Sequence, residues 1–498
     1  MYKVLFLMSL LLSMCVENVF AEQKALSDKT LGDLDKALHF YQSHFGVVGQ
    51  AVVILQQGQI VYESYLGLAD IEHQVPVTKN SIFPVYSLSK LLANVEIMQL
   101  VESGKIKMDV GIKQYLDHLP TTWQNITLEQ LLSHTSGLPE YFTDDYAMRN
   151  KKLEKNEAEV IDRISDKPFQ FVTSTDTCYN QTNYLLIRQI IEKLHNKNYT
   201  SIIKQSVFQP LNLLKTGFSG PTDVIPNRVD DYYAEQGKII RQYYFDFPPY
   251  AHAHSGLHAN ALNLATWLTA LVTGQFVNKT FLPDWFKATK YLDGSSSPYA
   301  KGWEYHQEDG VIMVGHDGGN KVSVRHLFLQ EERHANISVI YLTNGYQKAW
   351  FSMAELSKLL AAKIDQRFHS PLLALRYSMY QSIVQGRSEQ AYAHYRQFRL
   401  SDEGKITSTE STINTLGYMA LYNNLGQENV FKLFKENVKV YPKSSKSYAS
   451  LGRAYLHYGN HQLAEENYQQ ALRLNPQSKQ IYQILKKIKQ QKTHKKSE

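Results

Sequence analysis

Ser87 and Lys90 stand three residues apart at the start of a long apolar stretch. Residues at this spacing share one face of a helix, so the lysine amine can reach the serine hydroxyl. A neutral amine that accepts the hydroxyl proton would turn the serine into a nucleophile. A second pair, Ser201 and Lys204, has the same spacing, so the spacing alone does not identify a site.

The two pairs differ in the residues that surround them. Behind Ser87 the chain is apolar at nearly every position, which is typical of a helix that is buried on all sides. These positions are Leu88, Leu91, Leu92, Val95, Ile97, Met98, Leu100 and Val101. Burial lowers the pKa of a lysine and leaves a neutral amine on Lys90, whereas a one-sided apolar stripe leaves Lys204 in solvent. We therefore predict that Ser87 is a nucleophile at a helix N-terminus and that Lys90 is its base.

The elements before and after this helix can be read from the same kind of pattern. Apolar residues recur at helical spacing over residues 31–45, and two β-branched runs then flank Gln57-Gly58, which predicts a hairpin. The helix that carries Lys90 is expected to end at Ser103-Gly104, because glycine suits the position after a helix. A helix, a hairpin and a buried helix thus open the chain.

Strand-like segments return after a middle part in which, to about residue 286, helical stretches alternate with loops. These segments are residues 310–316, 321–329 and 336–345, and a helix is expected from residue 350 to about residue 367. Strands at both ends with helices between them predict one α/β domain over residues 27–367. Its antiparallel sheet would be assembled from both ends of the domain.

The character of the sequence changes to pairs of helices after about residue 370. Eight positions resemble the roughly 34-residue tetratricopeptide pattern: Tyr448, Leu451, Gly452, Tyr455, Ala464, Tyr468, Ala471 and Pro476. Phe434 and Pro442 lie one period earlier in a looser copy. A single repeat cannot bury its own apolar face, so several units must pack together. We expect all-α repeats over residues 370–490, able to bind a protein partner, and a solvated basic tail at residues 491–498.

The N-terminus predicts export. An apolar run over residues 4–16 follows a lysine, and small residues precede a cleavage position after Ala21. The run is too short to span a bilayer and indicates a secretory signal peptide at residues 1–21, hence a periplasmic or extracellular protein. A lipid anchor at Cys15 is the alternative. No later apolar stretch is long enough for a transmembrane segment.

Composition excludes some classes of function. The 498 residues are 43% hydrophobic with a net charge of +6, which indicates a globular protein of two or three domains. No basic stripe is interleaved with aromatic residues, so no nucleic-acid partner is expected. Cleavage after Ala21 would leave Cys178 as the only cysteine, which rules out an internal disulfide. Cysteines and histidines do not cluster at zinc-site spacing, and neither a metal nor a cofactor is expected.

Five further segments follow the Ser87 helix in a fixed order. They are "LLSHTSGLPEY" (131–141), "CYNQTNYLLIRQIIEKL" (178–194), "HSGLHANALNLATWLTAL" (254–271), "YAKGW" (299–303) and "GHDGGNKVSV" (315–324). As an ordered set they resemble the serine β-lactamase-like hydrolases, which include class C β-lactamases, D-alanyl-D-alanine carboxypeptidases and related esterases. The resemblance covers about residues 30–366. It implies a β-lactamase/transpeptidase-like fold, with an antiparallel sheet, flanking helices and an all-helical region, and members with C-terminal tetratricopeptide repeats are familiar.

The resemblance assigns catalytic roles position by position. Ser87 would be the acylated nucleophile and Lys90 the base that takes its proton. Tyr179 matches the tyrosine of the family's Tyr-x-Asn motif, whose phenol moves protons between nucleophile, leaving group and attacking water. These three residues would be the catalytic set.

The resemblance also implies a strand that binds the substrate. His316, Gly318 and Gly319 match the family's His-x-Gly-Gly strand. The backbone N–H of Gly319 would pair with that of Ser87 as the oxyanion hole, and His316 would help to hold the tyrosine and polar groups of the substrate.

Three positions depart from the family pattern. Gln181 replaces an asparagine and keeps an amide on a longer side chain, so it is retained as a substrate-binding residue. Tyr86 stands before the nucleophile, where a small residue is common, and would narrow the cleft. Arg188 replaces a usual glycine, for which we expect only local packing consequences. Together these departures predict an altered substrate preference.

The sequence therefore predicts an exported serine hydrolase that forms an acyl-enzyme with an ester or amide. D-amino-acid peptides, peptidoglycan fragments, small esters and β-lactam-like compounds all fit, and a carboxypeptidase or esterase is favoured over a dedicated β-lactamase. The alternative is a catalytically silent scaffold whose helical repeats bind a protein partner.

Overall fold

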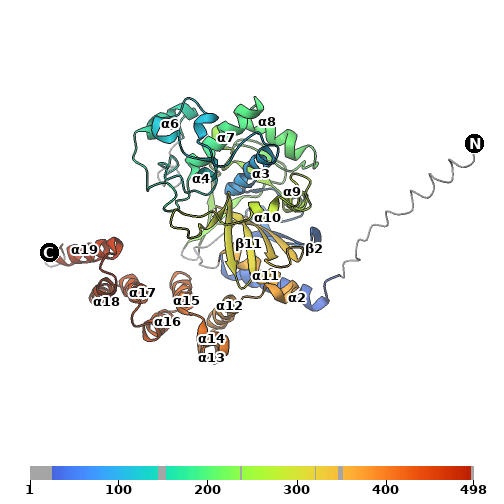
Figure 1. Ribbon diagram of the computed structural model, residues 1–498. Coiled ribbons are helices and arrows are strands. Elements are labelled where there is room, and N and C mark those ends of the chain that lie inside the picture. Colours follow the sequence, from blue (N-terminus) through green and yellow to red (C-terminus); the bar gives the residue numbers. More distant parts are fainter. Residues whose placement is uncertain (1–24, 144–152, 236–237, 320, 346–351, 495–498) are drawn as a thin grey trace, which may run out of the picture.

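The computed structural model of the protein describes most of the chain (Figure 1). The described residues are 25–143, 153–235, 238–319, 321–345 and 352–494. The predicted signal peptide and Cys15 lie outside them. Among the described helices, none is long and apolar enough to cross a membrane.

The larger part of the chain is built around an eight-stranded antiparallel sheet. Its strand order is β3-β2-β1-β13-β12-β11-β10-β9. The strands are β1 (Gly49–Gln56), β2 (Gln59–Asp70), β3 (Val75–Pro76), β9 (Tyr299–Ala300), β10 (Trp303–Glu308), β11 (Val311–Gly318), β12 (Val322–Leu329) and β13 (Asn336–Thr343). The predicted turn between β1 and β2 is present, with Gln57 and Gly58 both at positive φ, as a tight hairpin requires.

The two ends of the domain meet in the middle of this sheet. β1 pairs with β13 so that Gln50 lies opposite Thr343 and Ile54 lies opposite Val339. This pairing confirms the predicted sheet that is assembled from both ends of the domain.

The two faces of the sheet carry different layers, because alternate residues of a strand point to opposite sides. Val52 and Ile54 of β1 pack in one apolar cluster with α2 (Asp28–His44) and α11 (Met353–Ile364). Ala51, Val53 and Leu55 pack in another cluster with the helical region. A short 3-10 helix, η6 (Gln366–Phe368), follows α11.

The helical region lies between the two halves of the sheet in sequence. Its helices are α3 (Ser89–Glu102), α4 (Leu128–Leu132), α6 (Glu157–Ser165), α7 (Gln181–His195), α8 (Tyr199–Ile203), α9 (Ala261–Val272) and α10 (Leu282–Trp285), with a π-helix η4 (Lys204–Phe208) and 3-10 helices at 112–114, 121–123 and 249–251. α3 is buried along nearly its whole length, as predicted, and is followed by Ser103 and by Gly104 at φ 71°.

The middle of the chain also holds strands that the sequence pattern did not predict. β4 (Phe83–Pro84), β8 (Leu257–Ala259) and β5 (Gly217–Phe218) form a three-stranded sheet, and β6 (Asp231–Glu235) pairs with β7 (Lys238–Gln242). The expectation of helices and loops alone was wrong here. β4, β5 and β8, with two or three residues each, are too short to show an alternating pattern, whereas β6 and β7 have five residues each and were missed.

Arg188 has a wider role than local packing. Its side chain is 6% exposed and pairs with Glu157 of α6 and with Glu192 one turn further along α7. An arginine in place of glycine therefore ties α6 to α7, and the expected local effect was too narrow.

The C-terminal part is a row of helices that runs away from the side of the sheet covered by α2 and α11 (Figure 1). They are α12 (Pro371–Val384), α13 (Ser388–Leu400), α14 (Asp402–Ile406), α15 (Glu410–Tyr422), α16 (Gln427–Val440), α17 (Ser445–His457), α18 (His461–Leu474) and α19 (Lys479–His494). A Cβ on Gly452 would lie 3.1 Å from the ring of Tyr468, so glycine lets α17 and α18 approach closely. α19 includes the first residues of the expected basic tail, which are helical; residues 495–498 lie outside the described chain.

Candidate active site

Ser87 lies in a tight turn just before the buried helix. It is the middle residue of the 3-10 helix η1 (Tyr86–Leu88), and α3 begins at Ser89. The nucleophile therefore precedes the α-helix instead of starting it, which corrects the sequence prediction. Tyr86 has φ 46°, and Ser89 Oγ donates a hydrogen bond to its carbonyl at 2.7 Å. This left-handed residue turns the chain sharply beside the serine.

The structure brings Ser87, Lys90 and Tyr179 together. The Tyr179 hydroxyl donates to Ser87 Oγ at 2.8 Å, and Lys90 Nζ lies 3.4 Å from the same oxygen. The two contacts come from residues 92 and 3 positions away along the chain. One serine oxygen is thus within reach of both a phenol and an amine.

Lys90 is held in a protein environment without solvent contact. Its side chain is fully buried, and Nζ donates to Gln181 Oε1 at 2.7 Å and to the His254 carbonyl at 3.3 Å. Burial lowers the pKa of Lys90 well below its usual value, against the opposing charges of Glu140 and Glu304. The balance favours a neutral amine, which can accept a proton.

The start of α7 positions Tyr179 and Gln181. Asn180 caps the helix by accepting from Thr182 N–H at 2.7 Å, and its amide donates to the Leu138 carbonyl at 2.6 Å. The Asn180 N–H donates to His134 Nδ1 at 3.1 Å. The "HTSGLP" turn, which holds His134 and Leu138, therefore fixes the segment that presents the tyrosine.

Tyr179 keeps its proton. Tyr179 is 36% exposed as a whole, but desolvation of its hydroxyl raises the pKa of Tyr179 well above its usual value. The neighbouring ring of His134 has its centroid 4.7 Å away, and burial lowers the pKa of that histidine, so it adds no positive charge. The phenol is therefore a hydrogen-bond donor to Ser87 and not a phenolate.

Gln181 points toward Lys90, and its side chain, one methylene longer than asparagine, accepts a hydrogen bond from the Lys90 amine. This residue departs from the family asparagine, and the observed contact is with Lys90 at 2.7 Å. Its backbone N–H donates to Glu140 Oε2 at 2.6 Å.

Glu140 is a site residue that the sequence reasoning missed. Burial raises its pKa to about 7, although its carboxylate also accepts from Phe142 N–H at 2.7 Å. The only signal for it was its place in the "LLSHTSGLPEY" segment. A carboxyl that titrates near neutrality thus lies next to the base.

The end of β11 comes up against the turn that holds the nucleophile. A Cβ built on Gly318 would lie 2.5 Å from the Val85 carbonyl and 3.3 Å from Ser87 N. Gly319 has φ 55°, and a Cβ there would lie 2.8 Å from the Tyr86 ring. Both positions therefore require glycine, and this close approach places the backbone of the expected oxyanion-hole strand beside Ser87.

His316 lies beside Tyr179, with 5.7 Å between the ring centroids. Its Nδ1 is 2.5 Å from the Asp317 carbonyl oxygen, and its buried Nε2 makes no hydrogen bond, so neither ring nitrogen bonds the tyrosine hydroxyl. Burial lowers the pKa of His316, with Glu304 opposing. The histidine contributes a neutral ring to the wall of the site.

A buried charged group supports this wall. Arg325 pairs with Glu304 and, at 2.7 Å, with Asp317. Gly315 lies opposite Arg325 on β12 and opposite Glu304 on β10, so strand register alone brings the three together. The pairing of Arg325 with Glu304 could not be predicted without knowing this register.

A cleft of about 620 Å³ begins at this charged group and extends to the first C-terminal helices. Its walls include Tyr299 and Asp317 from the sheet domain and Arg376, Ser411 and Thr412 from α12 and α15. Its lining includes none of Ser87, Lys90 and Tyr179, so the cleft adjoins the charged group behind the site wall.

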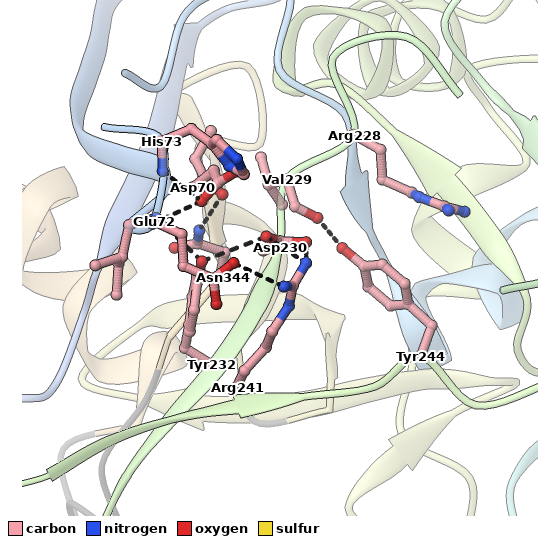
Figure 2. Close-up of polar contacts among 12 residues, drawn as sticks. Asp70, Glu72, His73, Arg228, Val229, Asp230, Tyr232, Arg241, Tyr244 and Asn344 are labelled. Carbon is pink, nitrogen blue, oxygen red and sulfur yellow. Dashed lines mark hydrogen bonds and ion pairs between the residues drawn. The ribbon is translucent and has the colours of Figure 1, made fainter. Parts of the chain in front are cut away.

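One group of potential metal ligands lies elsewhere, at the surface. Asp70, Glu72 and His73 come within ligand distance of one another. His73 Nδ1 already binds Asp70 Oδ2 at 2.5 Å, and Arg241 binds Glu72 (Figure 2). Because these groups engage one another and an arginine, the arrangement does not favour a cation.

The comparisons with known families agree with this architecture. The model of the family described as Beta-lactamase matches residues 34–362, and the model of the Tetratricopeptide repeat matches residues 445–478. A penicillin-binding protein of Bacillus subtilis (strain 168) is 25% identical over 326 residues, which are 61% of this chain and 70% of that protein.

Solved structures share the fold. The octameric penicillin-binding protein homologue from Pyrococcus abyssi has a TM-score of 0.56 and 22% identity, over 70% of this chain and 81% of its own. The D-amino acid amidase from Ochrobactrum anthropi SV3, solved with D-phenylalanine, has a TM-score of 0.56 and 18% identity. The match covers 68% of this chain and 100% of the amidase chain.

Proposed function

We propose that this chain, which belongs to the Beta-lactamase family and is a serine hydrolase in kind, cleaves an ester or amide through an acyl-enzyme on Ser87. One observation carries the proposal. The Ser87 oxygen lies within reach of the Tyr179 hydroxyl at 2.8 Å and of the buried Lys90 amine at 3.4 Å. A nucleophile with a base and an acid on one oxygen is the arrangement that covalent catalysis requires.

The reaction follows from the protonation states. Neutral Lys90 takes the Ser87 proton as Oγ attacks the carbonyl carbon. The oxyanion accepts from the N–H groups of Ser87 and Gly319, and each such donor is typically worth about 10²–10³ in rate. Tyr179, which keeps its proton, gives it to the leaving group. The deprotonated Tyr179 then takes a proton from the attacking water, and as the acyl product leaves, Lys90 returns its proton to Ser87 Oγ.

The substrate class within this reaction is an ester or amide of a small acyl group or peptide. D-amino-acid peptides, peptidoglycan fragments, small esters and β-lactam-like compounds all fit the constellation. A carboxypeptidase or esterase activity is favoured over a dedicated β-lactamase. The likeness in fold to a D-amino acid amidase supports amides among the candidates. Gln181 would act on the base through its contact with Lys90, and its predicted contact with the substrate remains part of the proposal.

Export rests on the sequence of residues 1–21, with the lipid anchor at Cys15 as the alternative. The helical repeats would bind a protein partner, which the match to the tetratricopeptide model supports. In the second candidate function this partner is the whole role, and the hydrolase domain is a silent scaffold. The close contacts on Ser87 favour the enzyme.

The test is covalent labelling of the full chain with a fluorophosphonate probe, read by intact mass and peptide mapping. We expect one adduct, on Ser87, which is lost in Ser87→Ala and kept in Ser201→Ala. Ser201 is the matched control because it has a lysine at the same spacing. A folded wild-type chain that takes no label at Ser87 would leave the scaffold as the function.

A further inference from the structure

Tyr86 reaches away from the nucleophile to a third part of the fold. Its ring packs against Gly319, and its hydroxyl donates to Asp231 Oδ2 at 2.5 Å. Asp231 lies on β6, 145 residues further along the chain. The residue that was expected to narrow the cleft is thus bonded to the β6–β7 hairpin.

The strand on the other side of the site reaches the same carboxylate. Lys321 lies two residues after Gly319, just beyond the end of β11, and its N–H donates to the Gly318 carbonyl at 3.0 Å. Its Nζ pairs with Asp231 Oδ1 and donates to Gln242 Oε1 at 2.9 Å. Asp231 and Lys321 are 3% and 2% exposed, so water does not compete with either partner of this ion pair.

The hairpin that carries Asp231 is itself fixed from outside (Figure 2). Arg241 of β7 bridges Asp230, at 2.7 Å, and Glu72, at 3.0 Å. The Tyr232 N–H donates to the Asn344 carbonyl at 2.7 Å. Residues on both sides of the Asp231 carboxylate are therefore anchored to the central sheet, and the carboxylate is a fixed point.

We propose that Tyr86, Asp231 and Lys321 are positioning residues that set the distance between the two N–H groups of the oxyanion hole. This inference rests on the proposed function. The Ser87 N–H follows Tyr86 directly, and the Gly319 N–H lies two residues before Lys321. Each segment is tied by a side chain to one oxygen of the same carboxylate. Because such donors act only when they are held in place, a small displacement lowers the rate without changing substrate binding.

Tyr86→Phe and Asp231→Asn test the inference in the full chain. Tyr86→Phe keeps the ring on Gly319 and removes the hydroxyl that bonds Asp231. We expect kcat for p-nitrophenyl acetate to fall about 10-fold in Tyr86→Phe and about 100-fold in Asp231→Asn, within the range that misplaced or missing donors cause. KM should stay within about twofold of wild type, since ground-state binding does not use these donors.

Two further readouts separate positioning from general structure. Phenylboronic acid adds Ser87 Oγ to boron, passes the serine proton to Lys90 and places one boron oxygen in the hole, so its inhibition constant should rise in step with the loss of kcat. The pH midpoint of the acid side of the kcat profile should not move, because none of the three residues contacts Lys90.

Lys238→Gln is the matched control. Lys238 is an exposed residue of β7 on the same hairpin and takes part in none of the contacts that hold Asp231, so kcat should stay within about twofold of wild type, as for most surface substitutions. If Tyr86→Phe retains both wild-type kcat and wild-type boronic acid affinity, the inference is overturned, even if Asp231→Asn does not fold. If wild type itself takes no label on Ser87, the proposed function fails and this inference fails with it.

Discussion

Ser87 and Lys90 lie where a buried helix begins, whereas Ser201 and Lys204 lie on α8 and η4, where the lysine is exposed. Both pairs have the same spacing. In the second, the Ser201 N–H is used to cap α8 through Asn198, at 2.9 Å. In the first, the lysine is fully buried and its amine faces the serine hydroxyl.

The difference shows that the spacing brings a serine and a lysine to one face, and that burial and third partners decide whether they form a site. Lys90 has Gln181 and the His254 carbonyl to hold its amine, and Ser87 has Tyr179 to hold its oxygen. These partners come from segments distant in the sequence. The following substitutions test that contrast, from the largest expected effect to the smallest.

Lys90→Met should separate the two pairs most strongly. Without a base, kcat/KM should fall by about 10³-fold or more, since general-base catalysis contributes on the order of 10²–10⁴ and acts here together with the nucleophile. Methionine has a similar length but leaves Gln181 Oε1 and the His254 carbonyl without this donor, so Tm should fall by no more than the loss of about two buried hydrogen bonds explains. The measurements are ester hydrolysis and thermal unfolding.

Lys204→Met is the control for that substitution. A surface change of this kind usually alters stability by less than about 0.5 kcal/mol, and we expect kcat/KM within about twofold of wild type. Equal losses in the two variants would show that burial does not distinguish the pairs.

Tyr179→Phe should reduce kcat by about 10²-fold, because the phenol gives its proton to the leaving group and general acids typically contribute this much or more. The expected result is a loss in kcat at nearly constant KM. Tyr291→Phe serves as the control, since its hydroxyl bonds Thr177 Oγ1 at 2.7 Å, two residues before Tyr179, and does not reach Ser87. A wild-type kcat in Tyr179→Phe would remove the tyrosine from the mechanism.

Gln181→Glu tests how the side chain that contacts Lys90 controls the pKa of this base. A carboxylate on the Lys90 amine favours the charged form, so the pKa of Lys90 should rise and the acid side of the pH–rate profile should move to higher pH. At pH 7 we expect about a 10-fold loss of kcat/KM, recovered at higher pH, in line with the usual effect of one close charge. Gln181→Asn, which withdraws the amide, should instead change the ratio of rates across a panel of esters and amides.

Much of the fold could be predicted because its long elements carry strong patterns. β1 and β13 are rich in β-branched residues, and α3 is apolar on all sides. These patterns predict both the type of each element and its burial. The strands β4, β5 and β8 have two or three residues each and form only because tertiary packing brings their backbones together.

The site divides in the same way. Ser87, Lys90 and Tyr179 belong to short motifs and could be predicted from the sequence. Asp231 and Glu304 could not, because a charge becomes part of a site only when strand register or a hairpin carries it there. Tyr86 was noticed as a departure, but its partner on β6 could not be read from any local pattern.

Glu140→Gln has the smallest expected effect, because it removes only a negative charge close to Lys90. The ionised carboxylate of Glu140 raises the pKa of Lys90, so the glutamine should leave more neutral amine and a higher rate. The pKa of Glu140 is itself about 7, which limits where this can be seen. Below pH 6 the wild-type carboxyl is already protonated, and the variant and wild type should have equal kcat/KM. Above pH 7 the variant should become faster, until Lys90 is neutral in both. A uniform loss at every pH would mean that Glu140 serves only to accept the N–H groups of Phe142 and Gln181, whereas a ratio that rises from one near pH 7 ties the carboxylate to the base through charge.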